Sequence, residues 1–106
     1  MTNVVSLTND NFLDFITKNK ICLVDFYADW CQPCKELVPI LNELSEEYID
    51  KAYLAKVNPE TANDIFKKYK VMGLPTLIIY VDGEMVKRQS GNLSKEDISK
   101  LLESYV

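Results

Sequence analysis

The sequence contains no histidine and only three cysteines among 106 residues. A closed zinc site needs four cysteine or histidine ligands, or three together with a carboxylate or a water molecule. Its one CxxC pair, Cys31 and Cys34, would have to recruit Cys22 and a carboxylate as further ligands. The number of available ligands therefore disfavours a zinc or iron–sulfur centre, and we expect no bound metal.

The sequence also lacks an excess of basic residues and any long apolar segment. Twelve lysines and arginines against sixteen acidic residues give a net charge of −4, whereas a nucleic-acid-binding protein needs a basic stripe to neutralise phosphates. The apolar runs "ICLV" and "TLIIYV" are far shorter than the ~20 residues that span a bilayer. We therefore expect a protein that binds neither nucleic acid nor membranes.

The N-terminal segment "MTNVVSLTND" lacks the basic and apolar regions of a secretory signal. This absence predicts a cytoplasmic location. Because permanent disulfides are rare in a reducing cytosol, a close cysteine pair is there more often catalytic or metal-binding than structural.

The hydrophobic pattern predicts an α/β protein that forms a single domain, residues 1–106. Apolar residues predict strands at 4–7, 21–28, 52–57, 76–81 and 84–90, and helices that begin after Thr8, at Cys31, after Asn58 and after Ser94. The order βαβαβαββα requires parallel pairing among the early strands, while Asp82-Gly83 predicts a hairpin between the last two. A mixed central sheet of about five strands with four helices on its two faces satisfies this order.

The position of the CxxC pair in this pattern favours redox chemistry, although two inert core cysteines would fit the motif alone. Cys31 follows a buried strand and opens the long helix, so its sulfur lies at the positive end of the helix dipole. A helix N-terminus stabilises a thiolate, which is the form that attacks a disulfide. Cys34 lies one turn further into the helix and is expected to be less exposed. We expect Cys31 to attack, Cys34 to resolve, and Cys22 to be a structural core thiol.

Two charged residues interrupt apolar strands, namely Asp25 in "LVDFY" and Lys56 in "LAKVN". A buried carboxylate has a raised pKa and often takes part in proton transfer. The same two residues could instead form a tolerated ion pair, and a lysine can extend its ammonium group to solvent. Both interpretations stay open from the sequence.

Five segments together resemble the thioredoxin family in order and spacing: "VDFYADWCQPCK", "LVPIL", "AKVN", "VMGLPTLIIYVDGE" and "SGNLSK". The resemblance covers essentially the whole chain. It implies the thioredoxin fold and the reduction of protein disulfides by a redox-active Cys31–Cys34 disulfide, with no bound cofactor. It also implies that Asp25 is a buried base for the proton of Cys34 and that Lys56 tunes this carboxylate.

The resemblance further implies a substrate groove in which Pro75 follows a cis peptide bond. The implied groove residues are Trp30, Gln32, Pro33, Gly73, Leu74, Pro75 and Gly91. Its implied partners are disulfide-containing proteins and a thioredoxin reductase, which we expect to be an NADPH-dependent flavoprotein, although a ferredoxin-linked enzyme is the alternative. We expect a monomer that donates electrons to target proteins and maintains the redox balance of the cytoplasm.

The sequence departs from the family pattern at four positions. Gln32 replaces the usual glycine of CGPC, Tyr27 stands where tryptophan is common, Asn58 takes a position often held by aspartate, and Cys22 is an additional thiol. Gln32 stiffens the loop beside the attacking sulfur, and we interpret it as a residue that tunes the redox reaction. The retained Pro33 favours a reductase. A binding or scaffold module with dispensable cysteines is the alternative function, because a fold does not determine a function.

Overall fold

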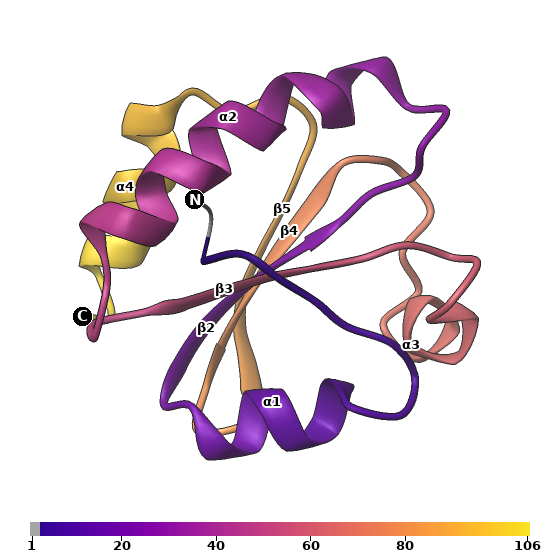
Figure 1. The fold of residues 1–106 in the computed structure, drawn as a ribbon, viewed down its shortest axis with the longest axis horizontal. Coiled ribbons are helices and arrows are strands. Elements are labelled where there is room, and N and C mark those ends of the chain that lie inside the picture. Colours follow the sequence, from indigo (N-terminus) through magenta and orange to yellow (C-terminus); the bar gives the residue numbers. More distant parts are fainter. Residues whose placement is uncertain (1–2) are drawn as a thin grey trace.

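Five strands form one mixed sheet that four helices cover (Figure 1). The computed structural model describes residues 3–106; Met1 and Thr2, which the predicted domain 1–106 includes, lie outside the described residues. The strands are β1 (Val5–Ser6), β2 (Ile21–Phe26), β3 (Tyr53–Val57), β4 (Thr76–Val81) and β5 (Glu84–Ser90). The helices are α1 (Phe12–Lys18), α2 (Gln32–Glu47), α3 (Asn63–Lys68) and α4 (Lys95–Glu103). The element order βαβαβαββα is the predicted one.

The strand order in the sheet is β1-β3-β2-β4-β5, which puts β2 at its centre. β3 pairs in parallel with both β1 and β2, while β4 runs antiparallel to β2 and β5 antiparallel to β4. The predicted mixed sheet is therefore confirmed. Although α3 connects β3 to β4, the chain crosses to the far side of β2 and reverses direction there.

Two helices cover each face of the sheet, with α2 and α4 on one side and α1 and α3 on the other (Figure 1). Every residue of β2 is buried, and successive side chains alternate between the two faces. Leu23 belongs to the apolar core under α2 and α4, whereas Val24 belongs to the core with residues of α1. This two-sided burial explains why β2 is a near-continuous apolar run.

Two predicted helix starts are wrong, because their polar side chains stabilise turns instead. α1 begins after Asn11, and Thr8 Oγ1 accepts the backbone N–H of Asp10 at 3.2 Å. The Oδ1 of Asn58 accepts the backbone N–H of Glu60 at 2.9 Å, and α3 begins only at Asn63. Short polar side chains bind nearby backbone groups in turns as readily as at helix starts, so the sequence alone did not separate the two cases.

The other element boundaries differ by a few residues. The predicted strand 21–28 ends at Phe26, and the first strand is only two residues long. The predicted helix start after Ser94 is confirmed, and a capping box forms there: Asp97 donates its backbone N–H to Ser94 Oγ at 3.1 Å, and Ser94 donates its own to Asp97 Oδ2 at 3.3 Å. The α4 start was predictable because this motif satisfies two helix N–H groups at once.

Two aliphatic residues of α1 provide a test of this packing. Ile16 is 1% exposed in the core, whereas Leu13 is 60% exposed on the same helix. We expect Ile16→Ala to lower the free energy of unfolding by about 2–5 kcal/mol, because it leaves a cavity. Leu13→Ala, the matched control, is expected to change it by less than ~0.5 kcal/mol. Urea unfolding of both variants measures the difference, and equal losses would contradict the described orientation of α1.

Candidate functional site

The two cysteines of the CxxC motif form a disulfide at the start of α2. Their Cα atoms lie 5.3 Å apart. Cys31 is the N-cap of the helix, and its Sγ accepts the backbone N–H of Cys34 at 3.2 Å. A helix N-terminus carries partial positive charge, and α2, described over its full length, has no acidic residue in its first turn. The site is thus built to stabilise negative charge on the Cys31 sulfur.

Cys31 and Cys34 are both buried, whereas several residues next to them in the sequence are exposed. Cys31, Cys34 and Ala28 form a small buried cluster, against which Tyr27 and Leu74 pack. The neighbouring groove residues predicted from the sequence, Trp30, Gln32 and Pro33, are exposed. Exposed apolar residues such as Trp30 and Pro33 beside a buried disulfide suit contact with a second protein chain.

Asp25 is buried in β2, with only 3% of its surface exposed. Successive side chains of a strand point to opposite faces, and Val24 points to the face that α1 covers. The side chain of Asp25 therefore lies on the other face, which α2 covers. The Oδ1 atom has no hydrogen-bond partner among residues 3–106. Burial raises the pKa of Asp25 to about 7, and the positive charge of Lys56 opposes this rise only in part. Asp25 can therefore exchange a proton near neutral pH.

Lys56 lies directly opposite Asp25 in the pairing of β2 with β3. Its Nζ is 5.6 Å from the centre of the Tyr27 ring, a cation–π distance. The Tyr27 hydroxyl in turn accepts a hydrogen bond from Asn58 Nδ2 at 3.3 Å. Tyr27 and Asn58, which the sequence marked only as departures from a family pattern, thus hold the lysine that acts on Asp25.

A hollow of about 190 Å³ lies beside the dithiol. Its walls include Tyr27, Cys34, Val38 and Lys56. A water molecule occupies roughly 30 Å³ of liquid, so the hollow is large enough for several. The hollow therefore has room for water next to Cys34 and next to Lys56, the neighbour of Asp25.

The segment before β4 lies against the two cysteines, because Leu74 packs on their cluster. The Leu74–Pro75 peptide is cis, as the resemblance implies, and the Pro75 carbonyl accepts the N–H of Gly91 at 2.9 Å. Gly91 has a positive φ of 93°, which favours glycine. The structure thereby brings Leu74, Pro75 and Gly91 together. Gly73 is exposed in the same loop.

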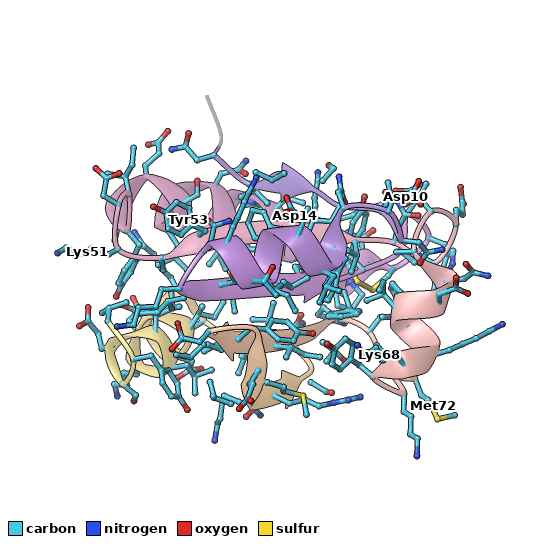
Figure 2. The ribbon with its side chains drawn as sticks, turned by 90° about the horizontal axis from the view of Figure 1, so that it is seen from below. Asp10, Asp14, Lys51, Tyr53, Lys68 and Met72 are labelled. Carbon is cyan, nitrogen blue, oxygen red and sulfur yellow. A yellow bond between two sulfur atoms is a disulfide. The ribbon has the colours of Figure 1, made fainter. Side chains whose placement is uncertain are left out.

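Met72 belongs to this loop and was missed by the reasoning from sequence. It is 92% exposed and points away from the protein beyond the end of α3 (Figure 2). No pattern in "KVMGLP" separates an exposed methionine from a core one, since Val71 and Leu74 on either side are partly buried. Only its place in the fold reveals it as an apolar surface residue.

Cys22 lies apart from the dithiol and is fully buried. Its Sγ is 3.3 Å from the carbonyl oxygen of Asn19, to which the thiol donates. Burial raises the pKa of the Cys22 thiol to about 12, so the thiolate form is scarce at neutral pH. These observations agree with the structural role expected from the sequence.

Residues 3–106 contain no group of three or more histidine, cysteine, aspartate or glutamate side chains that could hold a metal ion. Within the same range, no helix is both long enough and apolar enough to cross a membrane.

Comparison with known proteins finds similarity over the whole chain. The family model described as Thioredoxin matches residues 3–104. A thioredoxin from Staphylococcus saprophyticus is 38% identical over 103 residues, which cover 97% of this chain and 98% of that protein. A thioredoxin from Buchnera aphidicola is 38% identical over 108 residues, covering 100% of this chain and 99% of that protein. The solved structure of a mutant thioredoxin from Halobacterium salinarum has a TM-score of 0.90 and 31% identity, covering 99% of this chain and 94% of that one.

The buried carboxylate makes the stability of the protein depend on pH. The unfolded chain loses the Asp25 proton near pH 3.9, whereas the folded protein loses it near pH 7. Between these values the folded state binds more protons, so the free energy of unfolding falls as pH rises from about 4 to about 7. At 1.36 kcal/mol per pKa unit, the full penalty above pH 7 is roughly 4 kcal/mol.

We therefore expect Asp25→Asn to raise the free energy of unfolding by up to about 4 kcal/mol at pH 8 and to leave it nearly unchanged at pH 4. Urea unfolding of the oxidised protein at both pH values checks this. Asp29→Asn, which changes an exposed carboxylate, is the control and should show no such difference. A gain of equal size at pH 4 and pH 8 would show that ionisation is not the cause.

Proposed function

The chain belongs to the thioredoxin family, and on that premise we propose that it is a thiol–disulfide oxidoreductase that reduces disulfide bonds in other proteins. The observation that carries this proposal is the Cys31–Cys34 disulfide at the N-terminus of α2, where the Cys34 N–H donates to the Cys31 sulfur. A sulfur held in this way is stabilised as a thiolate once the disulfide is reduced.

The reaction takes place in two exchange steps. In the reduced protein, the Cys31 thiolate attacks one sulfur of a target disulfide, forms a mixed disulfide and releases the first target thiolate. The Cys34 thiolate then attacks the Cys31 sulfur, releases the second target thiolate and restores the Cys31–Cys34 disulfide. Two electrons pass to the target, and the two protons of the dithiol end on the target thiols.

Asp25 serves as the base for the second step in this proposal. Cys34 must lose its proton before it can attack, and a carboxyl group whose pKa is about 7 can accept one near neutral pH. The hollow between Cys34 and Lys56 has space for the water that would carry the proton. Lys56 tunes Asp25 by its positive charge, and the ring of Tyr27 holds that charge in place.

The exposed surface around the dithiol is proposed to bind an extended segment of the substrate. The backbone of Leu74 would pair with the substrate backbone, as in β-augmentation. The groove residues are Trp30, Gln32, Pro33, Gly73, Leu74, Pro75 and Gly91. Gln32 occupies an exposed position at the start of α2, where a polar side chain tunes the reaction without blocking it. Pro33, the second residue between the two cysteines, is retained from the family pattern and favours a reductase.

The physiological setting is part of the proposal. We infer that residues 1–106 act as one domain and as a monomer in the cytoplasm, without a bound cofactor, nucleic acid or membrane. The protein would receive its electrons from a thioredoxin reductase, namely an NADPH-dependent flavoprotein. They would pass to disulfide-containing proteins, which places the chain in electron transport and cell redox homeostasis.

The reductase activity is tested by insulin reduction with dithiothreitol as the electron source. We expect Cys31→Ser to abolish the stimulation above the dithiothreitol background, because the attacking thiolate is lost. Cys34→Ser should instead form a mixed disulfide with the substrate that accumulates, visible on a non-reducing gel. Cys22→Ser is the control for loss of a thiol elsewhere and should retain activity. Equal rates for the wild type and Cys31→Ser would rule out the proposal.

The proton-transfer role of Asp25 has a separate test. We expect Asp25→Asn to slow the release of product from the mixed disulfide by at least about tenfold at pH 7, because Cys34 loses its base. The first attack by Cys31 should change little. Rapid-quench analysis of the reduced protein with excess insulin separates the two steps. Unchanged release of product would show that Asp25 does not serve as the base.

A further inference from the structure

The loop between α3 and β4 carries the cis peptide, and its C-terminal end is fastened to β5. The N–H of Gly91 donates to the Pro75 carbonyl at 2.9 Å. The hydroxyl of Thr76 donates to the Gly73 carbonyl at 2.6 Å and lies 3.1 Å from the Ser90 hydroxyl. This end of the loop is therefore held by backbone and hydroxyl groups.

The other end of the loop is held by one side chain of β5, that of Arg88. Its Nη1 donates to the carbonyl of Tyr69, and its Nη2 donates to the carbonyl of Lys70 at 3.0 Å. The last carbonyls of a helix have no partner within the helix and carry partial negative charge. The planar fork of an arginine can bind two such oxygens at once, which a lysine cannot do.

The backbone turns sharply at the residues that Arg88 binds. Lys70 has a φ of 52°, in the left-handed region that residues other than glycine rarely adopt. The N–H of Val71 then returns to the carbonyl of Phe66 at 3.0 Å, which ends the helical segment. Arg88 therefore binds at the turn that sets the direction in which the loop leaves α3.

Arg88 reaches this turn because of its register in the sheet. It lies opposite Ile78, whose side chain is in the core together with residues of α1, and against which Phe66 and Tyr69 also pack. Lys87 lies opposite Ile79, which belongs to the core on the other face. Successive residues of β5 thus point to opposite faces of the sheet. Lys87 carries the same charge as Arg88 but points away from the loop, so it serves as a matched control.

The middle of the loop has few contacts of its own. Met72 is 92% exposed, and apart from Gly73 and its two chain neighbours no atom of residues 3–106 lies within 4 Å of the place where a Cβ on Gly73 would be. Leu74 follows directly and packs on the cluster of Cys31 and Cys34. The place of the Leu74 backbone beside the dithiol therefore depends on how the two ends of the loop are held.

We propose that Arg88 is a positioning residue for substrate binding: its guanidinium holds the start of the loop at residues 71–75 so that the Leu74 backbone can pair with an extended segment of a protein disulfide. This inference rests on the proposed function. Arg88 itself touches neither cysteine, so a small disulfide that meets only Cys31 does not need it. The predicted signature is a defect for protein substrates alone.

The test compares insulin with DTNB, a small aromatic disulfide, as substrates of the reduced protein. We expect Arg88→Met to raise the KM for insulin on the order of three- to tenfold, the scale of the net contribution of one ordinary hydrogen bond. The kcat for insulin and the rate constant with DTNB should change less than about twofold. Arg88→Lys, which keeps the charge without the fork, should be intermediate. Lys87→Met removes the same charge from the opposite face and should match the wild type.

Amide hydrogen exchange adds a readout of the loop itself. In Arg88→Met the N–H of Val71 should exchange faster, while the midpoint of urea unfolding stays close to that of Lys87→Met. An unchanged KM for insulin, a parallel loss with DTNB, or an equal defect in Lys87→Met would each overturn the inference. Should Arg88→Met fail to fold, the same comparisons with Arg88→Lys decide. Failure of the wild type to reduce either disulfide through Cys31 would refute the proposed function instead.

Discussion

The central position of β2 is the constraint on which the rest of the structure depends. Because β2 lies between β3 and β4 and is buried on both faces, its C-terminal end is the place where several segments must meet. The chain leaves the sheet there and enters α2 at Cys31. The antiparallel β4 begins at the same edge, with Thr76 opposite Phe26. The disulfide and the cis peptide before β4 therefore lie together, although residues 35–73 separate them in the sequence.

The same burial accounts for the chemistry of Asp25. A carboxylate in the central strand cannot keep its water shell, and its charged form is disfavoured there. Lys56 lies across from it on β3, and its positive charge returns only part of the lost stabilisation. The ammonium group of Lys56 lies over the ring of Tyr27. The protein thus keeps an acid of nearly neutral pKa, and the hollow beside its neighbour Lys56 reaches Cys34. A more complete ion pair would stabilise the fold and would hold the carboxylate ionised, unable to be protonated near neutral pH.

The edge strand β5 contributes to the site in a different way. All of its residues are exposed, and a register irregularity with charged residues beside it discourages pairing with other sheets. Its side chain Arg88 and Gly91, the residue that follows the strand, instead bind the loop before β4, and Ser90 binds Thr76 at the start of β4. A strand that adds little to the core thereby holds the segment that we propose binds the substrate.

The sequence by itself determined the element order, the mixed sheet and the CxxC pair at a helix start, because periodic burial and cysteine spacing are local signals. It also singled out Asp25, since a lone charge in an apolar run is visible without a structure. The turns at Thr8 and Asn58 were mistaken for helix starts, because the same side-chain bonds serve both. Only the tertiary structure decided the exposure of Met72, the hold of Tyr27 on Lys56 and the reach of Arg88 to α3. These features join residues that are distant or patternless in the sequence, and packing in three dimensions alone brings them into contact.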